Sequence, residues 1–511
     1  MGHVSRRSRP HAWKIAMAVC MLALLLAPPQ SMAGTPTDST VGFYHGAPNR
    51  AGHYVVPGLT WQSVAGAHRD QAFDGRVNGH IYAQPLYWRP SGEEHGLVIA
   101  ATENNDVVAL DAASGVLRWQ AHLGRSVSAS MLPCGNIDPL GITGTPVINQ
   151  AQGAIYLDAM VDNRGAPRHL VYGLRLTDGA VLPGFPIDVA AQLAARGVRF
   201  DPATQNQRGA LALMEDRVLI PFGGHYGDCG DYHGTVVAIA TDKPRLTAVW
   251  TTRAPKGGIW APAGLSAADG SLFFATGNTK GVHDWQDGEG AFRVDIDLAH
   301  STSPQDVFVP PNWKQLDQDD LDLGGVTPLP LTLPGNTTKL LMALGKDGNA
   351  YLLDRTHLGG IGGALAVYRA AEGIIITAAA AYPVGGEVQV IYQANRVVCP
   401  DGRSVSGLGS LTVTAQSGKH LRSAWCARLD GGGAPIVTTS DGSSDPIVWV
   451  VGAQGDDRLH GYRGDSGQQI YSGSGSDDRL KGLRHLATIL AAAGRFYVAG
   501  DGRIYAFTLP H

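Results

Sequence analysis

One pattern of apolar and polar positions recurs along this chain. In its clearest copy, Val107–Trp119, an apolar stretch leads into Asp111 and Gly115, and a second short stretch follows that ends in tryptophan. β-Branched and aromatic residues favour strands, and a segment running from Asp to Gly favours a tight turn. The pattern therefore predicts a β-hairpin whose second strand is closed by an aromatic side chain.

Weaker copies of this unit follow at the spacing of propeller blades, in which each blade adds its own layer of core. The copies are Leu110–Trp119, Leu174–Phe185, Val237–Trp250, Phe292–Asp297, Ala350–Tyr368, Val413–Trp425, Leu459–Tyr471 and Ile504–Phe507. The last copy ends before a closing strand. We expect an all-β, eight-bladed β-propeller over residues 57–511, closed by the N-terminal strand Pro57–Ser63, which carries Trp61.

Composition agrees with short strands joined by tight turns. Glycine contributes 67 of 511 residues and only 16% of residues are charged. The net charge of -4 provides no basic surface for nucleic acid. Segments rich in small residues are predicted to be innermost strands around a channel, and they are Gly141–Val147, Gly209–Leu213, Gly258–Pro262 and Gly433–Val437. The longest break, Thr276–Gly290, is expected to be an insertion within the fourth blade.

Residues 1–33 have the features of a secretory signal peptide. An arginine-rich start precedes the apolar stretch Ile15–Leu26, and a small-residue cleavage motif ends at Ala33. The apolar stretch is too short to span a bilayer. We expect cleavage after Ala33, an N-terminal segment at 34–56, and a monomeric periplasmic or extracellular protein without a transmembrane segment in the mature chain.

Four cysteines remain after that cleavage, and four cysteines allow three pairings. In a propeller, the loop before each innermost strand and the loop between the second and third strands of a blade lie on one face. Cys134 and Cys229 fall in such loops of neighbouring blades, whereas Cys399 and Cys426 belong to one blade. We expect disulfides Cys134–Cys229 and Cys399–Cys426.

The same two classes of loop carry the unusual polar residues, which predicts a polar mouth at one end of the channel. The candidate ligand-binding residues are Asn136, Asp138, Asn206, Arg208, His225, Asp228, His233, Trp260, Lys346 and Asp347. Each has a structural alternative, such as a turn, loop packing or a salt bridge.

Two groups in these loops are also candidate metal ligands. Asp319, Asp320 and Asp322 offer oxygen ligands to calcium but lack the glycine of an EF-hand loop. His225, Asp228 and His233 could bind a metal or act as acid and base, or simply pack their loop.

The Ala109–Trp119 unit resembles the tryptophan-docking repeat of the pyrroloquinoline-quinone (PQQ) propeller superfamily. Further segments resemble a group of exported bacterial PQQ-like propeller proteins without an assigned activity, among them Tyr82–Leu86, Cys134–Thr143, Gly257–Trp260 and Asp320–Gly324. Some members of the superfamily are dehydrogenases that hold PQQ and calcium in the channel, and others are cofactor-free binding scaffolds. This sequence has no adjacent Cys-Cys pair and no C-terminal Cys-x-x-Cys-His haem motif. It also shows no local match to the calcium ligands or the catalytic-base Asp.

These departures favour an exported scaffold without a cofactor, which binds an envelope protein or a small polar or carbohydrate ligand through its loop face. The alternative is a PQQ- and calcium-dependent dehydrogenase of alcohols or sugars, in which an Asp acts as base. A hydrolase or lyase built on His225 and His233 is the third reading.

Overall fold

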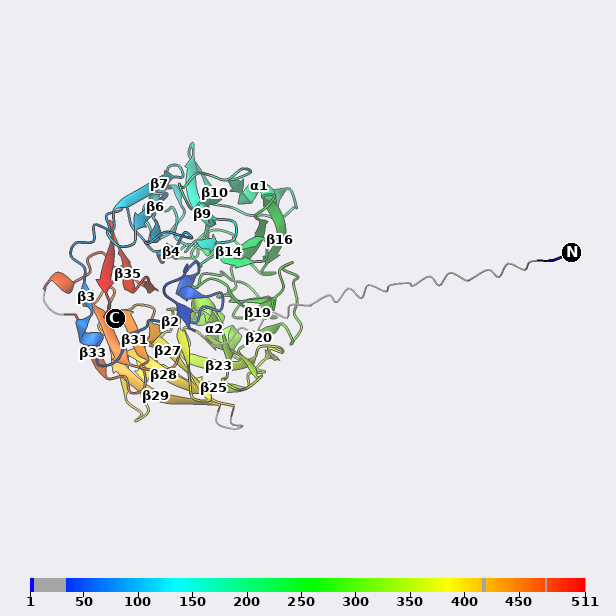
Figure 1. Cartoon of the computed structure of the whole chain (residues 1–511). Coiled ribbons are helices and arrows are strands. Elements are labelled where there is room, and N and C mark those ends of the chain that lie inside the picture. Colours follow the sequence, from blue (N-terminus) through cyan, green and yellow to red (C-terminus); the bar gives the residue numbers. More distant parts are fainter. Residues whose placement is uncertain (4–33, 416–419, 474–475, 511) are drawn as a thin grey trace.

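The computed structural model describes residues 1–3, 34–415, 420–473 and 476–510. Its strands form eight sheets that stand in a ring (Figure 1), so the protein is an all-β propeller, as predicted. Each of the eight repeat units lies in a different sheet. Residues 4–33 of the expected signal peptide, including its cleavage site, and residues 416–419 in the sixth repeat unit lie outside the described residues.

The first four sheets follow the chain around half of the ring. The first contains β4 (Leu86–Trp88), β5 (Leu97–Ala101), β6 (Asp106–Asp111) and β7 (Leu117–His122). The second contains β8 (Val147–Asn149), β9 (Ala154–Asn163), β10 (Ala166–Arg175) and β11 (Ile187–Asp188). The third contains β12 (Gln205–Asn206), β13 (Ala212–Met214), β14 (Arg217–Gly224), β15 (Thr235–Ala240) and β16 (Arg245–Thr251). The fourth contains β17 (Ser266–Ala268), β18 (Ser271–Ala275), β19 (Ala291–Val294), β20 (Val307–Val309) and β24 (Gly360–Ile361).

The other four sheets complete the ring. The fifth contains β21 (Leu329–Thr332), β22 (Lys339–Leu344), β23 (Asn349–Asp354) and β25 (Ala366–Arg369). The sixth contains β26 (Ala380–Val384), β27 (Glu387–Val398), β28 (Ser404–Val413) and β29 (Leu421–Arg428). The seventh contains β30 (Ile436–Thr439), β31 (Ile447–Val451), β32 (Leu459–Arg463) and β33 (Gln469–Tyr471), extended by β1 (Thr35–Pro36) and β2 (His53–Val55). The eighth contains β34 (Ile489–Ala492), β35 (Arg495–Gly500), β36 (Arg503–Thr508) and β3 (His68–Arg69).

The segments between strands contain two short α-helices, α1 (Val189–Ala194) and α2 (Trp313–Asp319). None of the helices in the described part of the chain is long and apolar enough to cross a membrane. The expected insertion at Thr276–Gly290 lies between β18 and β19, as predicted. The four segments predicted as innermost strands precede the observed strands β8, β13, β17 and β30 by up to a few residues, or overlap their first residues.

The turn glycines and the tryptophans of the repeat fit together across neighbouring sheets. The indole of Trp119 donates a hydrogen bond to the carbonyl of Leu176 (2.9 Å), and a Cβ at Gly179 would lie 2.6 Å from the ring. Trp425 docks in the same way on the turn at Gly467. Both glycines have positive φ, so the turn needs glycine for its backbone and for the close approach of the ring. The repeat is therefore a device for joining one sheet to the next.

The ring is closed by an N-terminal strand, but not the expected one. β3 pairs antiparallel with β36, whereas Trp61 lies in a turn and its indole donates to the carbonyl of Pro446 in the seventh sheet (2.9 Å). Thr60 and Ser63 exchange side-chain to backbone hydrogen bonds that coil this segment. Such local bonds compete with an extended strand.

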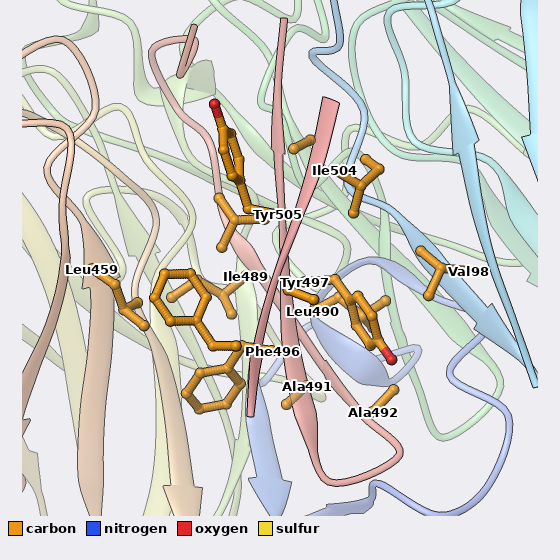
Figure 2. Packing of buried hydrophobic residues seen from close by; sticks show 14 of the residues in the cluster. Val98, Leu459, Ile489, Leu490, Ala491, Ala492, Phe496, Tyr497, Ile504 and Tyr505 are labelled. Carbon is orange, nitrogen blue, oxygen red and sulfur yellow. The ribbon is translucent and has the colours of Figure 1, made fainter. Parts of the chain in front are cut away.

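Apolar side chains fill the spaces between sheets, and Figure 2 shows the cluster around β34–β36. Phe496 and Tyr497 alternate to opposite sides of β35, so the eighth sheet packs against both of its neighbours. The cluster includes Leu459 from the seventh sheet and Val98 from the first. The two ends of the ring therefore meet in one continuous core.

The N-terminal segment (34–56) crosses the centre of the ring, where Figure 1 shows it in blue beside the label of β2. Its backbone bonds to the inner edges of one sheet after another. Val41 pairs with Tyr87, and β2 pairs in parallel with β30. The carbonyls of Thr37, Gly42, Pro48 and Ala51 accept from Ala493, Ile148, Ala267 and Ala381. The segment is therefore built into the propeller.

Polar side chains of this segment are buried in the centre. Arg50 is 2% exposed and donates to the carbonyls of Leu211 (2.8 Å) and Leu265 (2.9 Å), which precede β13 and β17. Burial lowers the pKa of Arg50 to about 9 and that of His45 to about 3, so the imidazole is neutral at pH 7. Tyr44 packs against alanines in the segments that precede β13, β17, β26 and β30, namely Ala210, Ala263, Ala378 and Ala434. These residues plug the channel.

Candidate functional site

A cavity of about 610 Å³ opens on the loop face of the ring, within the size range of small-molecule sites. Most of the polar residues predicted for the mouth line it. The lining comprises Asn136, Asn206, Arg208, Gly224, His225, Tyr226, Gly227, Asp228, Tyr232, Gly258, Trp260, Gly277, Asn278, Asp320, Asp322, Lys346, Ile374, Ile376, His485 and Leu486. The loops that precede innermost strands and the loops between second and third strands converge on it, as expected for the fold.

Trp260 is held on this cavity by a buried carboxylate. Its indole nitrogen donates to Asp322 Oδ2 (3.2 Å), and the backbone N–H of Asn278 donates to Oδ1 (2.9 Å). Asp322 itself is 4% exposed. The aromatic ring is therefore fixed by a polar contact at its edge, and it lines the cavity as an apolar surface of the kind that stacks with planar ligands.

Lys346 is the cation of this group. Its Nζ lies 2.6 Å from Asp322 Oδ2, 2.9 Å from Asp320 Oδ1 and 5.3 Å from the centre of the Trp260 ring. Burial works to lower the pKa of Lys346, but Asp322 and Asp320 outweigh it and raise the pKa, so the amine is charged. A cation beside an aromatic face can hold an electron-rich oxygen of a planar ligand.

A second buried acid lies behind Asp322. Glu289 is fully buried and accepts a hydrogen bond from the backbone N–H of Leu323 (2.6 Å). Burial, followed by the charge of Asp322, raises the pKa of Glu289 well above its usual value. This shift favours the neutral form of Glu289, and Asp322 is the acid that faces Lys346 and Trp260.

The loop carrying His225 and Asp228 forms one rim of the cavity. His225 Nε2 donates to the carbonyl of Ala203 (3.1 Å), and burial lowers the pKa of His225 to about 4. Asp228 accepts a hydrogen bond from the hydroxyl of Tyr232. The Nζ of Lys256 donates to the carbonyl of Asp228 (2.6 Å), so bonds within the loop and bonds to neighbouring loops together fix its shape.

Both predicted disulfides are present, with Cys134 joined to Cys229 and Cys399 joined to Cys426. The first ties the loop of Asn136 to the loop of His225 and Asp228 at the rim. The second joins the residue after β27 to β29 within the sixth sheet. Only the first can influence the shape of the cavity directly.

Removal of the rim disulfide should cost more stability than removal of the other. Chain-entropy arguments relate the stabilisation to the length of the closed loop, and the separations are 95 and 27 residues. We expect the Cys134→Ser/Cys229→Ser variant to lose about 1 kcal/mol more in urea unfolding than Cys399→Ser/Cys426→Ser. A smaller loss at the rim than in the sixth sheet would contradict this.

Four of the sequence candidates lie away from the cavity lining. Asp138 accepts from a backbone N–H of the turn before it, and His233 Nδ1 donates to a backbone carbonyl. Asp347 accepts from the backbone N–H two residues on and from a tyrosine hydroxyl. Asp319 is exposed at the end of α2 and accepts from a glutamine amide. Each of these side chains has a local structural partner.

The cavity also contains residues that were not among the ten candidates. Asn278 lies in the insertion between β18 and β19, and His485 precedes β34. Ile374 and Ile376 precede β26 and supply an apolar wall. For His485, Ile374 and Ile376, a position before an innermost strand was the available signal, because isoleucine and a lone histidine have no motif of their own.

Two acidic residues of the cavity share one cationic partner in this arrangement. Asp320 and Asp322 both bind the ammonium of Lys346, which occupies the place between them. Within residues 34–415, 420–473 and 476–510, no group of three or more His, Cys, Asp or Glu side chains is placed to bind a metal ion.

No family model matches this chain, and no curated protein matches it. The structure is similar to that of a quinohemoprotein alcohol dehydrogenase from Comamonas testosteroni, with 12% identity over 92% of this chain and 80% of that one and a TM-score of 0.59. A quinohemoprotein alcohol dehydrogenase from Pseudomonas putida HK5 gives 13% identity, 93% and 80% coverage and a TM-score of 0.57. A europium-containing methanol dehydrogenase gives 13% identity over 92% of this chain and 98% of that one, with a TM-score of 0.56. At these identities the likeness is one of fold.

Proposed function

We propose that this protein is a quinone-dependent dehydrogenase that oxidises a hydroxyl group of a small substrate in the channel cavity. The observation that carries the proposal is the group formed by Trp260, Asp322 and Lys346, a fixed aromatic face with a charged amine beside it. The fold shared with quinohemoprotein alcohol dehydrogenases adds support. These findings favour the dehydrogenase over the non-catalytic scaffold that the sequence suggested.

The residues present fit a planar tricyclic quinone such as PQQ. The cavity of about 610 Å³ is large enough for such a molecule, and Trp260 offers it a stacking surface. Lys346 would hold one of its oxygens. When bound, such a quinone accepts two electrons and two protons, which converts an alcohol to a carbonyl compound.

Asp320 is the residue best placed to take the proton of the substrate hydroxyl. Its side chain is 67% exposed on the cavity, unlike that of Asp322, which is buried and occupied by Trp260 and Lys346. Lys346 bonds Asp320 Oδ1 and so orients the carboxylate. A general base must lie within hydrogen-bond reach of the proton it removes, and Asp320 exposes its carboxylate to the cavity while Oδ1 bonds to Lys346.

The residues fit calcium less well. A divalent cation prefers several carboxylate oxygens, and the ammonium of Lys346 already neutralises the two that the cavity offers. We therefore expect quinone binding to persist in a chelator.

Purified protein should be titrated with PQQ in calcium and in EDTA, with thermal unfolding and dye-linked alcohol oxidation as readouts. Ligand at 100 times its Kd stabilises a protein by about 2.7 kcal/mol. We expect stabilisation and turnover of alcohols in both conditions. If PQQ gives neither stabilisation nor turnover in either buffer, the proposal is wrong.

We further propose that each of the eight sheets is one blade of a single domain at 57–511, with residues 1–33 acting as a signal peptide and the N-terminal segment (34–56) between them. The pairing of β3 with β36 supports closure of an eight-bladed ring. Two disulfides support an oxidising compartment, in the periplasm or outside the cell.

A further inference from the structure

Beneath the main cavity lies a smaller one of about 20 Å³, which can hold a single water-sized group. Arg208, His485 and Leu486 line both cavities and so mark their junction. Tyr44 of the N-terminal segment (34–56) lines the small cavity, at the channel plug. The pocket therefore continues inward from Trp260 and Lys346 and ends at the plug.

Arg208 at this junction bonds to a neutral partner. Its Nη2 donates to His485 Nε2 (2.8 Å). Burial, and then the charges of Arg208 and Arg484, lower the pKa of His485 to about 4, so the imidazole is uncharged. Within the described part of the chain, no carboxylate forms an ion pair with Arg208. Glu103, whose charge acts on Arg208, is fully buried, and burial raises the pKa of Glu103 to about 7.

Tyr44 provides another hydrogen-bond donor at the small cavity, and this donor has no partner. Its hydroxyl is buried, with the residue 3% exposed, and makes no hydrogen bond to any described residue. Burial raises the pKa of Tyr44, so the hydroxyl keeps its proton and can donate. A buried polar atom without a partner is costly, and it is satisfied when a ligand or water occupies the site.

We propose that the inner end of the pocket, formed by Arg208, His485 and Tyr44, binds a carboxylate group of the ligand in the main cavity. The guanidinium fork matches carboxylate geometry, and the hydroxyl of Tyr44 adds a neutral donor below it. This deepens the proposed function, because the carboxylate can belong either to the quinone or to a hydroxy acid substrate. The binding itself does not depend on which of the two carries it.

The test compares Arg208→Gln with Arg484→Gln by calorimetry. Arg484 is a matched control, because it directly precedes His485 in the sequence and its charge is already paired with Asp501 (2.6 Å). The probes are PQQ, the uncharged tricyclic quinone 1,10-phenanthroline-5,6-dione, and lactate. Loss of a charge-assisted bond should weaken carboxylate binding 10- to 100-fold.

We expect Arg208→Gln to weaken PQQ or lactate by that factor and to leave the uncharged quinone unchanged, while Arg484→Gln changes none of them. Weakening of PQQ alone assigns the carboxylate to the quinone, and weakening of lactate assigns it to the substrate. Tyr44→Phe should reduce the same affinity by a smaller factor. Equal affinities of wild type and Arg208→Gln for both PQQ and lactate overturn the proposal, as does failure of the wild type to bind either.

The two proposals can fail separately. If neither quinone binds but lactate binding is lost in Arg208→Gln, the carboxylate site stands and the quinone function falls. If the uncharged quinone binds through Trp260 while Arg208→Gln changes nothing, the function stands and the carboxylate site falls.

Discussion

Replacement of Trp260 with alanine should lower the affinity for PQQ by about 100-fold or more. A stacked aromatic pair contributes about 1 kcal/mol beyond the apolar area it buries, and loss of an indole face removes on the order of 100 Å² of that area. Together these terms amount to about 3 kcal/mol. Fluorescence or calorimetric titration of the variant measures the loss directly.

Two further variants make this test specific. Trp260→Phe keeps an aromatic face and should retain most of the affinity, although it loses the bond to Asp322 Oδ2. Trp61→Ala removes a tryptophan in the turn that packs on the seventh sheet, away from the cavity, and should bind PQQ like the wild type. A Trp260→Ala variant with wild-type affinity would show that the quinone, if bound, lies elsewhere.

Replacement of Arg50 with methionine should destabilise the whole propeller by about 3 kcal/mol. The guanidinium is 2% exposed and satisfies the carbonyls of Leu211 and Leu265, which methionine would leave buried without a donor. Each unsatisfied buried acceptor costs about 1–3 kcal/mol. Urea unfolding followed by tryptophan fluorescence measures the change, provided that the variant folds.

An exposed arginine gives the matching control. Arg76 pairs with Asp74 at the surface, and its side chain is 79% exposed, so Arg76→Met should change the free energy of unfolding by less than about 1 kcal/mol. Equal urea midpoints for Arg50→Met and Arg76→Met would show that the central contacts contribute little to stability. Failure of Arg50→Met alone to accumulate as folded protein agrees with the expected direction.

The repeat and the disulfides were predictable because each depends on local sequence. A hairpin with a turn glycine and a closing tryptophan is encoded within about a dozen residues, and Trp119 and Trp425 dock as that pattern requires. Once the repeat gave the positions of the loops, the partner of Cys134 followed from their common face.

The centre of the ring could not be predicted in this way. His45 and Arg50 look like residues of a solvated linker, and only distant carbonyls and hydroxyls, such as those of Leu265 and Thr488, make their burial possible. The prediction that the segment of Trp61 is the closing strand was wrong, because hydrogen bonds between Thr60 and Ser63 fold that segment into a turn. Candidate loop residues such as His233 form hydrogen bonds with nearby backbone groups, and no sequence motif predicts those bonds.

The position of the N-terminal segment (34–56) sets the order in which the molecule can be completed. This segment leaves the ribosome before any of the sheets, yet its partners include Thr438 in β30 and Ala493 after β34. β3 likewise pairs with β36, which is synthesised near the end of this sequence. Contacts over such sequence separations form slowly. The N-terminal segment (34–56) therefore completes its contacts only after the last sheets have formed. A chain that ended within the eighth sheet would lack both the pairing that closes the ring and some of the contacts at its centre.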